Sequence, residues 1–272
     1  MIVIDDPDDP RVAPFRLNER GLTSRAQRRD DGGDGLFMAE GDLVVERALE
    51  AGCVPVMVLV DAKNPPAIVE RLAEVVPIYS GGERLRAAIT KLGMPYSVVA
   101  LFQRPPRATV AELVTTAKRL VIVEAVDNPV NIGSIARNAL ALGWDGLLLD
   151  STSADPLARR ALRVSMGHSL HLPHARANGL AAAIHSLTTA GVVVCALTPA
   201  PAALPLDRVP PRQRMAVIVG SERGGLTPDT MAAATHLVSI PMLDGVDSLN
   251  VAAATAIACW QLRSTSASAA DR

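Results

Sequence analysis

The C-terminal part of the chain alternates short apolar runs with helical patterns, and this alternation limits the folds that it can adopt. The apolar runs lie at residues 120–126, 144–150, 171–175, 192–197, 216–220 and 236–242. Helical patterns lie at residues 131–143, 155–162, 179–190 and 248–263. Strands that alternate with helices form a mostly parallel sheet with helices on its faces. We therefore predict an α/β fold with a mostly parallel sheet.

A smaller α/β pattern precedes this part. Apolar runs at 36–39, 54–60 and 97–102 predict strands, with helical patterns between them. The Pro-Pro pair in QRPPRAT, residues 103–109, predicts a linker. The expected division is a flexible, charged arm at 1–34, a small domain at 35–104, a linker at 105–117, a larger domain at 118–265 and a disordered tail at 266–272.

The composition and the N-terminal sequence argue against a disordered, a broadly basic, a secreted or a membrane-spanning protein. Hydrophobic residues make up 49% of the 272 residues, so the chain can bury a sizeable core. The formal net charge is −1, so any surface for nucleic acid must be a local patch. The N-terminus lacks the pattern of a signal peptide and no apolar run is long enough to span a membrane, which predicts a cytoplasmic protein.

The cysteines and histidines do not predict a metal site. Cys53, Cys195 and Cys259 are far apart in apolar surroundings, which favours buried thiols in a reducing compartment. His168, His171 and His174 are close in sequence, but Pro173 interrupts a helix and their spacing does not line one strand face. We expect no metal.

Three polar stretches follow predicted strands. In DNPVNIGSIARNA, residues 127–139, Asn131 is a candidate helix cap and Arg137 follows six residues later. A single arginine on a helix is usually only solvated, so this stretch alone predicts no chemistry.

The second stretch is AVIVGSERGGLTPD, residues 216–229. Its glycines allow a close backbone approach, whereas Glu222 would repel a diphosphate. For this stretch alone, a plain strand-to-helix turn with a surface glutamate is the preferred explanation. In the third stretch, SIPMLDGVDSLNVAAATAI, residues 239–257, Ser248 is a candidate N-cap for the last helix.

Taken together, the ordered motifs NxGxxxR, GSExxGL and IPMxxxxxSLNVAxA resemble the SpoU (TrmH-like) family of SPOUT methyltransferases, which methylate the ribose 2′-hydroxyl of RNA. The segment from GLFMAEGDLVVERAL to VPVMVLV is similar to the ribosomal-protein-like, substrate-binding domain that is often fused to them. The resemblance implies S-adenosylmethionine as cofactor, a deep trefoil knot in the larger domain and a homodimer through that domain.

The resemblance also implies roles for individual residues. The catalytic candidates are Asn131, Arg137, Glu222, Ser248 and Asn250. The cofactor-binding candidates are Leu197, Thr198, Gly220, Ile240, Met242, Leu249 and Asn250. Because a guanidinium stays protonated, we expect Arg137 to hold an RNA phosphate or the developing alkoxide rather than to act as a base.

RNA contacts are expected from local clusters of arginines. The principal candidates are Arg25, Arg28, Arg29, Arg159, Arg160 and Arg163, with Arg16, Arg20, Arg104 and Arg107 as further ones. With only 3% aromatic residues, shape recognition of folded RNA is expected to outweigh base stacking.

The expected reaction is 2′-O-methylation of rRNA. A tRNA substrate and a non-catalytic RNA-binding protein with the same fold remain alternatives. An NAD-dependent oxidoreductase is disfavoured, because the chain has no GxGxxG after a first strand.

Overall fold

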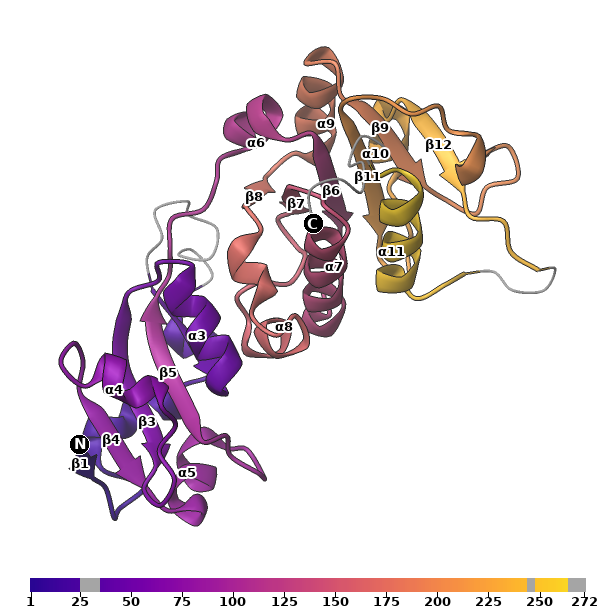
Figure 1. Cartoon of the computed structure of the whole chain (residues 1–272). Coiled ribbons are helices and arrows are strands. Elements are labelled where there is room, and N and C mark those ends of the chain that lie inside the picture. Colours follow the sequence, from indigo (N-terminus) through magenta and orange to yellow (C-terminus); the bar gives the residue numbers. More distant parts are fainter. Residues whose placement is uncertain (25–34, 244–247, 264–272) are drawn as a thin grey trace, which may run out of the picture. The chain divides into compact units, whose positions relative to one another are not determined.

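The computed structural model describes residues 1–24, 35–243 and 248–263. The chain divides into two compact units (Figure 1). Unit 1 comprises residues 1–107 together with 155–171, and unit 2 comprises residues 108–154 together with 172–272.

Unit 2 is built on a seven-stranded sheet in the order β10-β12-β9-β11-β6-β7-β8, in which every described pair is parallel. The strands are β6 (Arg119–Glu124), β7 (Gly146–Asp150), β8 (His174–Ala177), β9 (Val193–Leu197), β10 (Leu204–Pro205), β11 (Met215–Gly220) and β12 (His236–Ser239). Alternate residues of the central strands are buried against different helix layers, which explains their nearly continuous apolar sequence. The predicted α/β fold with a mostly parallel sheet is confirmed.

Helices cover both faces of this sheet. One face carries α7 (Pro129–Ala141) and α11 (Val251–Gln261), which lie side by side (Figure 1). The other carries α6 (Val110–Thr116), α9 (Leu180–Thr189) and α10 (Pro228–Ala233). A short 3₁₀ helix, η3 (Leu206–Arg208), follows β10.

Buried donors hold the end of α11 against the sheet. Arg119 Nε donates to the Leu262 carbonyl at 2.9 Å, and Trp144 Nε1 donates to the Cys259 carbonyl at 3.0 Å. These bonds satisfy carbonyls at the helix end that have no partner within the helix. They hold α11 in place, and the third motif lies at the start of this helix.

Unit 1 contains a five-stranded sheet in the order β1-β4-β3-β5-β2. The strands are β1 (Ile2–Val3), β2 (Leu36–Glu40), β3 (Pro55–Asp61), β4 (Ile78–Gly81) and β5 (Val98–Gln103). Strand β5 pairs antiparallel with β2 and β3, whereas β4 pairs parallel with β1 and β3. This smaller sheet is therefore mixed.

Two layers also cover the sheet of unit 1. One consists of α3 (Asp42–Glu50), α4 (Ile68–Leu72), α8 (Arg159–Val164) and η2 (His168–His171). The other consists of η1 (Pro10–Arg16), α1 (Glu19–Leu22) and α5 (Glu83–Thr90). Each layer encloses its own apolar cluster.

The structure differs from the expected flexible arm at residues 1–34. Residues 1–24 supply a strand and two short helices to unit 1, and Val12 and Phe15 are completely buried. The apolar residues here are separated by Asp, Pro and Arg, so they produce no periodic signal, while Asp9 and Asn18 cap the helices. Residues 25–34 and the expected tail at 266–272 lie outside the described residues.

Three further boundaries differ from expectation. Residues 155–171 pack in unit 1 rather than in the larger domain, because Leu157 and Leu162 join its apolar cluster. The expected linker contains α6, whose Thr109 and Glu112 form a capping box. The run at 171–175 is a strand only from His174, since η2 ends at His171 and Leu172 and Pro173 connect the two elements.

Candidate active site

The three motifs of unit 2 lie at one edge of the sheet. Strands β6, β11 and β12 are parallel members of it, and each motif follows one of them. The carboxyl ends of parallel strands meet at the same edge, which is where ligands bind in open α/β sheets. The sheet order therefore brings together residues that are up to 119 positions apart in sequence.

Asn131, Glu222 and Asn250 form one hydrogen-bonded group. Asn131 Nδ2 donates to Glu222 Oε1 at 2.9 Å, and Asn250 Nδ2 donates to the same oxygen at 3.1 Å. Asn250 Nδ2 also lies 3.2 Å from Asn131 Oδ1. Asn131 is buried, whereas Glu222 and Asn250 are exposed. One carboxylate thus joins all three motifs.

The helix caps differ from those expected. Asn128, not Asn131, caps α7, since its Oδ1 accepts from Val130 N. Asn250, not Ser248, caps α11, because its Oδ1 accepts from the backbone nitrogens of Ala252 and Ala253. Capping by Asn128 leaves the Asn131 amide available to Glu222.

The GSERGG loop folds back on itself directly after β11. A Cβ at Gly220 would lie 2.4 Å from the Gly225 carbonyl carbon and oxygen, closer than side chains approach. Gly225 has a φ of +63°, and Ser221 and Gly225 form an antiparallel bridge. Ser221 Oγ accepts from Gly224 N at 3.1 Å. Glycine is therefore required at 220 by close contact and favoured at 225 by its φ angle.

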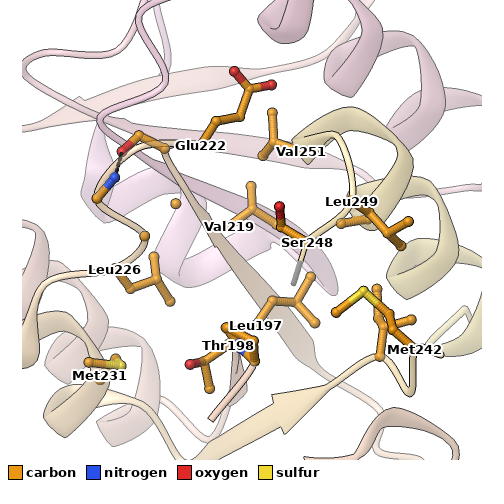
Figure 2. A pocket seen from close by; sticks show the side chains of 17 residues that line it. Leu197, Thr198, Val219, Glu222, Leu226, Met231, Met242, Ser248, Leu249 and Val251 are labelled. Atoms are coloured by element: carbon orange, nitrogen blue, oxygen red, sulfur yellow. Dashed lines mark hydrogen bonds between the residues drawn. The ribbon is translucent and has the colours of Figure 1, made fainter. Parts of the chain in front are cut away.

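A cavity of about 460 Å³ lies beside this loop. Six of the seven residues predicted to bind the cofactor line it: Leu197, Thr198, Gly220, Ile240, Met242 and Leu249. The seventh, Asn250, does not line it and instead belongs to the group around Glu222. Figure 2 shows Glu222 at one side of the cavity and Thr198 and Met231 at the opposite side.

Of the predicted catalytic residues, Glu222 and Ser248 line the cavity. Arg137 does not: it is exposed on α7, six residues beyond Asn131. Six residues correspond to about 240° around a helix, so the two side chains leave α7 on different faces. Within one chain, the residues lining the cavity therefore do not include the predicted catalytic arginine.

Two carboxylates that the motifs do not contain hold the site loops: Glu124, which is buried, and Asp150, which is half-buried. Glu124, at the end of β6, accepts from Thr227 N, Thr227 Oγ1 and Thr230 Oγ1 at 2.8–2.9 Å. It thereby fixes the turn between GSERGG and α10. The sequence signal was present, since LVIVEAV places this acid inside an apolar strand.

Asp150, at the end of β7, holds the connection between β6 and α7. It accepts from Ala125 N and from the backbone and hydroxyl groups of Thr152 and Ser153. Burial alone would raise the pKa of Asp150, but the hydrogen bonds from Ser153, Thr152 and Ala125 lower it overall. Ala125 itself has a φ of +57°.

The arginines expected to contact RNA are placed differently from one another. Arg159 donates to Glu40 Oε1 and Arg163 Nη1 donates to Glu40 Oε2 at 3.0 Å, and the Glu40 side chain is 1% exposed. Both side chains thus stabilise unit 1 internally. Arg160 is exposed on α8. Arg25, Arg28 and Arg29 lie outside the described residues.

Two of the four additional candidates, Arg104 and Arg16, also have internal contacts. Arg104 is buried and donates to Asp155 Oδ2 at 2.7 Å. Arg16 donates to the Pro7 carbonyl and lies 3.5 Å from Asp8 Oδ1. Arg20 is exposed and Arg107 is half-buried.

The cysteines are buried free thiols, and burial raises the pKa of Cys53 to about 11 and that of Cys195 to about 12. In residues 1–24, 35–243 and 248–263, no group of three histidine, cysteine or acidic side chains is placed to hold a metal ion. Within the same ranges, no helix has the length and apolar character needed to cross a membrane.

Comparison with known proteins identifies relatives of both units. The sequence model of the SpoU rRNA Methylase family matches residues 118–260. An uncharacterised tRNA/rRNA methyltransferase of Mycobacterium bovis is 36% identical over 94% of this chain and 89% of its own length. The 23S rRNA (guanosine(2553)-2′-O)-methyltransferase RlmP of Bacillus subtilis is 30% identical over 84% of this chain and 88% of its own.

Solved structures agree with these relatives. The AdoMet-bound rRNA methyltransferase of Sinorhizobium meliloti superposes with a TM-score of 0.80 over 96% of each chain, at 26% identity. An RNA 2′-O ribose methyltransferase gives a TM-score of 0.79 over 96% of this chain and 98% of its own, at 25% identity.

Proposed function

The chain belongs to the SpoU rRNA Methylase family, and from this premise we propose that it transfers a methyl group from S-adenosylmethionine to a ribose 2′-hydroxyl of RNA. The observation that carries the proposal is the hydrogen-bonded group of Asn131, Glu222 and Asn250. It joins the three motifs at the edge of an apolar cavity, where a cofactor and a polar substrate can meet.

The cavity has the chemistry that the cofactor requires. Its wall combines apolar side chains such as Leu197, Ile240 and Leu249 with the backbone of the GSERGG loop, which suits a nucleoside. The close backbone approach at Gly220 keeps the space beside the loop free of a side chain. Glu222 lies at the rim, where a carboxylate is compatible with a sulfonium cation but not with a diphosphate.

S-adenosylmethionine, when bound, supplies an activated methyl group, so the chain itself must position the acceptor and stabilise charge. Glu222 orients the amides of Asn131 and Asn250. Ser248, exposed at the cavity wall, offers a hydroxyl that can hydrogen-bond the ribose. Arg137 stabilises the developing alkoxide or holds the adjacent phosphate.

The position of Arg137 supports a homodimer. Helix α11 leaves Ile257 and Trp260 exposed at 42% and 57%, and Val130 on the adjacent α7 is 38% exposed. An exposed apolar surface of this kind is typical of an interface between proteins. We infer that two copies pair through unit 2, so that Arg137 of one copy reaches the cavity of the other. Ile257→Glu should then give monomers by light scattering and lower the rate of methyl transfer.

Three finer features belong to the same proposal. The substrate is rRNA, as in the relative RlmP, with tRNA as the alternative. Unit 2 has the knotted topology of the family, a proposal that the close contact between α11 and α7 supports. A cytoplasmic location fits an RNA substrate and the free thiols of Cys53, Cys195 and Cys259.

The direct test incubates the purified chain with methyl-labelled S-adenosylmethionine and separate rRNA and tRNA fractions from cells that lack it. Digestion to nucleosides and mass spectrometry should give a 2′-O-methylnucleoside from rRNA. Label in tRNA alone would show that the substrate is tRNA rather than rRNA. Label on a base, or cofactor binding without transfer to either RNA, would contradict the reaction.

A further inference from the structure

Unit 1 contains a cavity that is separate from the methyl-transfer site. It has a volume of about 380 Å³, and its wall includes Asp42, Leu43, Tyr96, Ser97, Arg163 and Met166. This size lies within the range of about 300–1,000 Å³ that is typical of small-ligand sites. We propose that this cavity binds an unpaired guanine base of the RNA substrate, a proposal that rests on the proposed function.

Tyr96 provides a fixed aromatic surface in this cavity. The Tyr96 carbonyl accepts from Nη1 of Arg86, which is buried and paired with Asp61 at 2.5 Å. The ring lies against Gly41, where an added Cβ would be 3.1 Å from Tyr96 Cδ1. Tyr96 is nevertheless 41% exposed. A ring that is held in place and still exposed is suited to stacking with a base.

Asp42 supplies acceptors beside this ring. Ser97 Oγ donates to Asp42 Oδ1 at 2.5 Å, which orients the carboxylate at the exposed start of α3. A carboxylate only accepts hydrogen bonds, and it repels phosphate. Guanine presents two adjacent donors, N1–H and N2–H, to such a group, whereas the other bases present a donor next to an acceptor. The carboxylate therefore favours guanine over adenine, cytosine and uracil.

Two further lining residues, Arg163 and Met166, supply a donor and an apolar contact. Arg163 uses Nη1 for Glu40, and its side chain remains 28% exposed, so further N–H groups can reach a carbonyl such as guanine O6. Met166 has a φ of +52°, unusual for a residue with a side chain, and its carbonyl accepts from Arg47. Backbone held in such a conformation is concentrated at binding sites.

These features give unit 1 a recognition role that differs from phosphate binding. Arg159 and Arg163, which the sequence suggests as phosphate contacts, instead hold Glu40, and of the two only Arg163 lines the cavity. A base bound on Tyr96 would select a sequence, whereas arginines on phosphates would not. The inference thus concerns how the enzyme chooses its RNA, not how it transfers the methyl group.

Methionine methyl groups allow both cavities to be observed in the full chain. Met166 lines the cavity in unit 1, Met231 and Met242 line the one in unit 2, and Met94 is 86% exposed. The chain is labelled with ¹³C-methyl methionine, and the signals are assigned by single Met→Leu substitutions. Guanosine 5′-monophosphate (GMP) should shift the methyl signal of Met166 until the site is saturated. It should bind about tenfold more tightly than AMP, CMP or UMP.

Variants test the chemistry. Tyr96→Ala should weaken GMP binding about tenfold and raise the KM for RNA while leaving kcat unchanged, and Tyr96→Phe should bind as the parent does. Asp42→Asn should remove the preference for GMP. Met94→Ala, in the same loop as Tyr96, is the matched control and should change nothing.

The outcomes separate this inference from the proposed function. A Met166 signal that GMP leaves unmoved up to its solubility limit would overturn the inference, as would equal binding of all four nucleotides. A peptide or protein fraction that shifts Met166 where nucleotides do not would also overturn it. Failure of S-adenosylmethionine to shift Met231 and Met242, with no methyl transfer, would overturn the proposed function instead.

Discussion

Asn131 Nδ2 donates a hydrogen bond of 2.9 Å to Glu222 Oε1, across 91 residues of sequence. This bond connects the start of α7 to the loop after β11. Asn250 donates to the same oxygen from the start of α11. Glu222 is consequently the group through which the three loops of the site are positioned relative to one another.

Removal of this acceptor should disorganise the site without unfolding the protein. Glu222→Ala removes both hydrogen bonds to Oε1, and each bond to a charged acceptor contributes about 1.5–3 kcal/mol. We expect methyl transfer to slow at least about tenfold, since 1.4 kcal/mol corresponds to that factor. Glu222→Gln, which keeps an acceptor, should lose less. Arg223→Ala is the neighbouring control, and a Glu222→Ala variant as active as this control would contradict the role.

The glycine loop offers a matched pair of substitutions. Gly220→Ala places a Cβ 2.4 Å from the Gly225 backbone, whereas Gly224→Ala meets nothing nearer than Ser221 Oγ at 3.5 Å. Overpacking of this kind costs about 1–3 kcal/mol. Gly220→Ala should therefore lower the thermal unfolding midpoint and weaken cofactor binding in calorimetry, and Gly224→Ala should do neither. Equal behaviour of the two variants would show that the backbone contact is unimportant.

Asp150 should make the stability of unit 2 sensitive to acid. Because hydrogen bonds lower its pKa in the folded state, it stabilises the fold above its ordinary pKa of 3.8, and this stabilisation is lost as the pH falls toward the lowered value. Denaturant titrations from neutral pH to below this pKa should show a smaller decrease in the free energy of unfolding for Asp150→Asn than for the parent. Asp207→Asn, an exposed carboxyl, is the control. The account fails if both variants follow the parent curve.

Substitutions of the adjacent residues Arg159 and Arg160 on α8 should have different effects, the first on stability and the second on RNA binding. Arg159 pairs with the buried Glu40, and Arg163 keeps this carboxylate paired, so Arg159→Ala should cost only its own charged hydrogen bonds, about 2 kcal/mol of the free energy of unfolding. Arg160 is exposed, and Arg160→Ala should change stability by less than about 0.5 kcal/mol. Denaturant unfolding measures the first effect. A filter-binding salt titration with rRNA should give a flatter slope for Arg160→Ala, and an unchanged slope would remove this residue from the RNA contacts.

The sheet of unit 2 could be predicted because its strands have a simple signal. Residues 120–126 and 216–220 are nearly uninterrupted apolar runs, and they become β6 and β11 with small shifts at the ends. Gly220 could be singled out from its place after such a run. The contact with Gly225 that requires a glycine at this position could not be predicted. It depends on how the six-residue GSERGG loop folds back on itself, and the sequence pattern does not show this.

Other features lack a local signal. Residues 155–162 are predicted as a helix, but nothing in their sequence shows that Leu157 and Leu162 pack in unit 1. Strand β4 is only four residues long, and Pro77 precedes it. The sequence does not decide the helix caps, because Asn128 and Asn131, like Ser248 and Asn250, are both acceptable caps, and the residue at which each helix begins depends on the fold.

Arg137 tests the central claim most directly. Wild-type protein and Arg137→Ala are compared for S-adenosylmethionine binding by calorimetry and for 2′-O-methylnucleoside formation in rRNA by mass spectrometry. The account predicts that Arg137→Ala binds the cofactor as the wild type does and forms no 2′-O-methylated product above background. A variant that methylates rRNA at nearly the wild-type rate would contradict it.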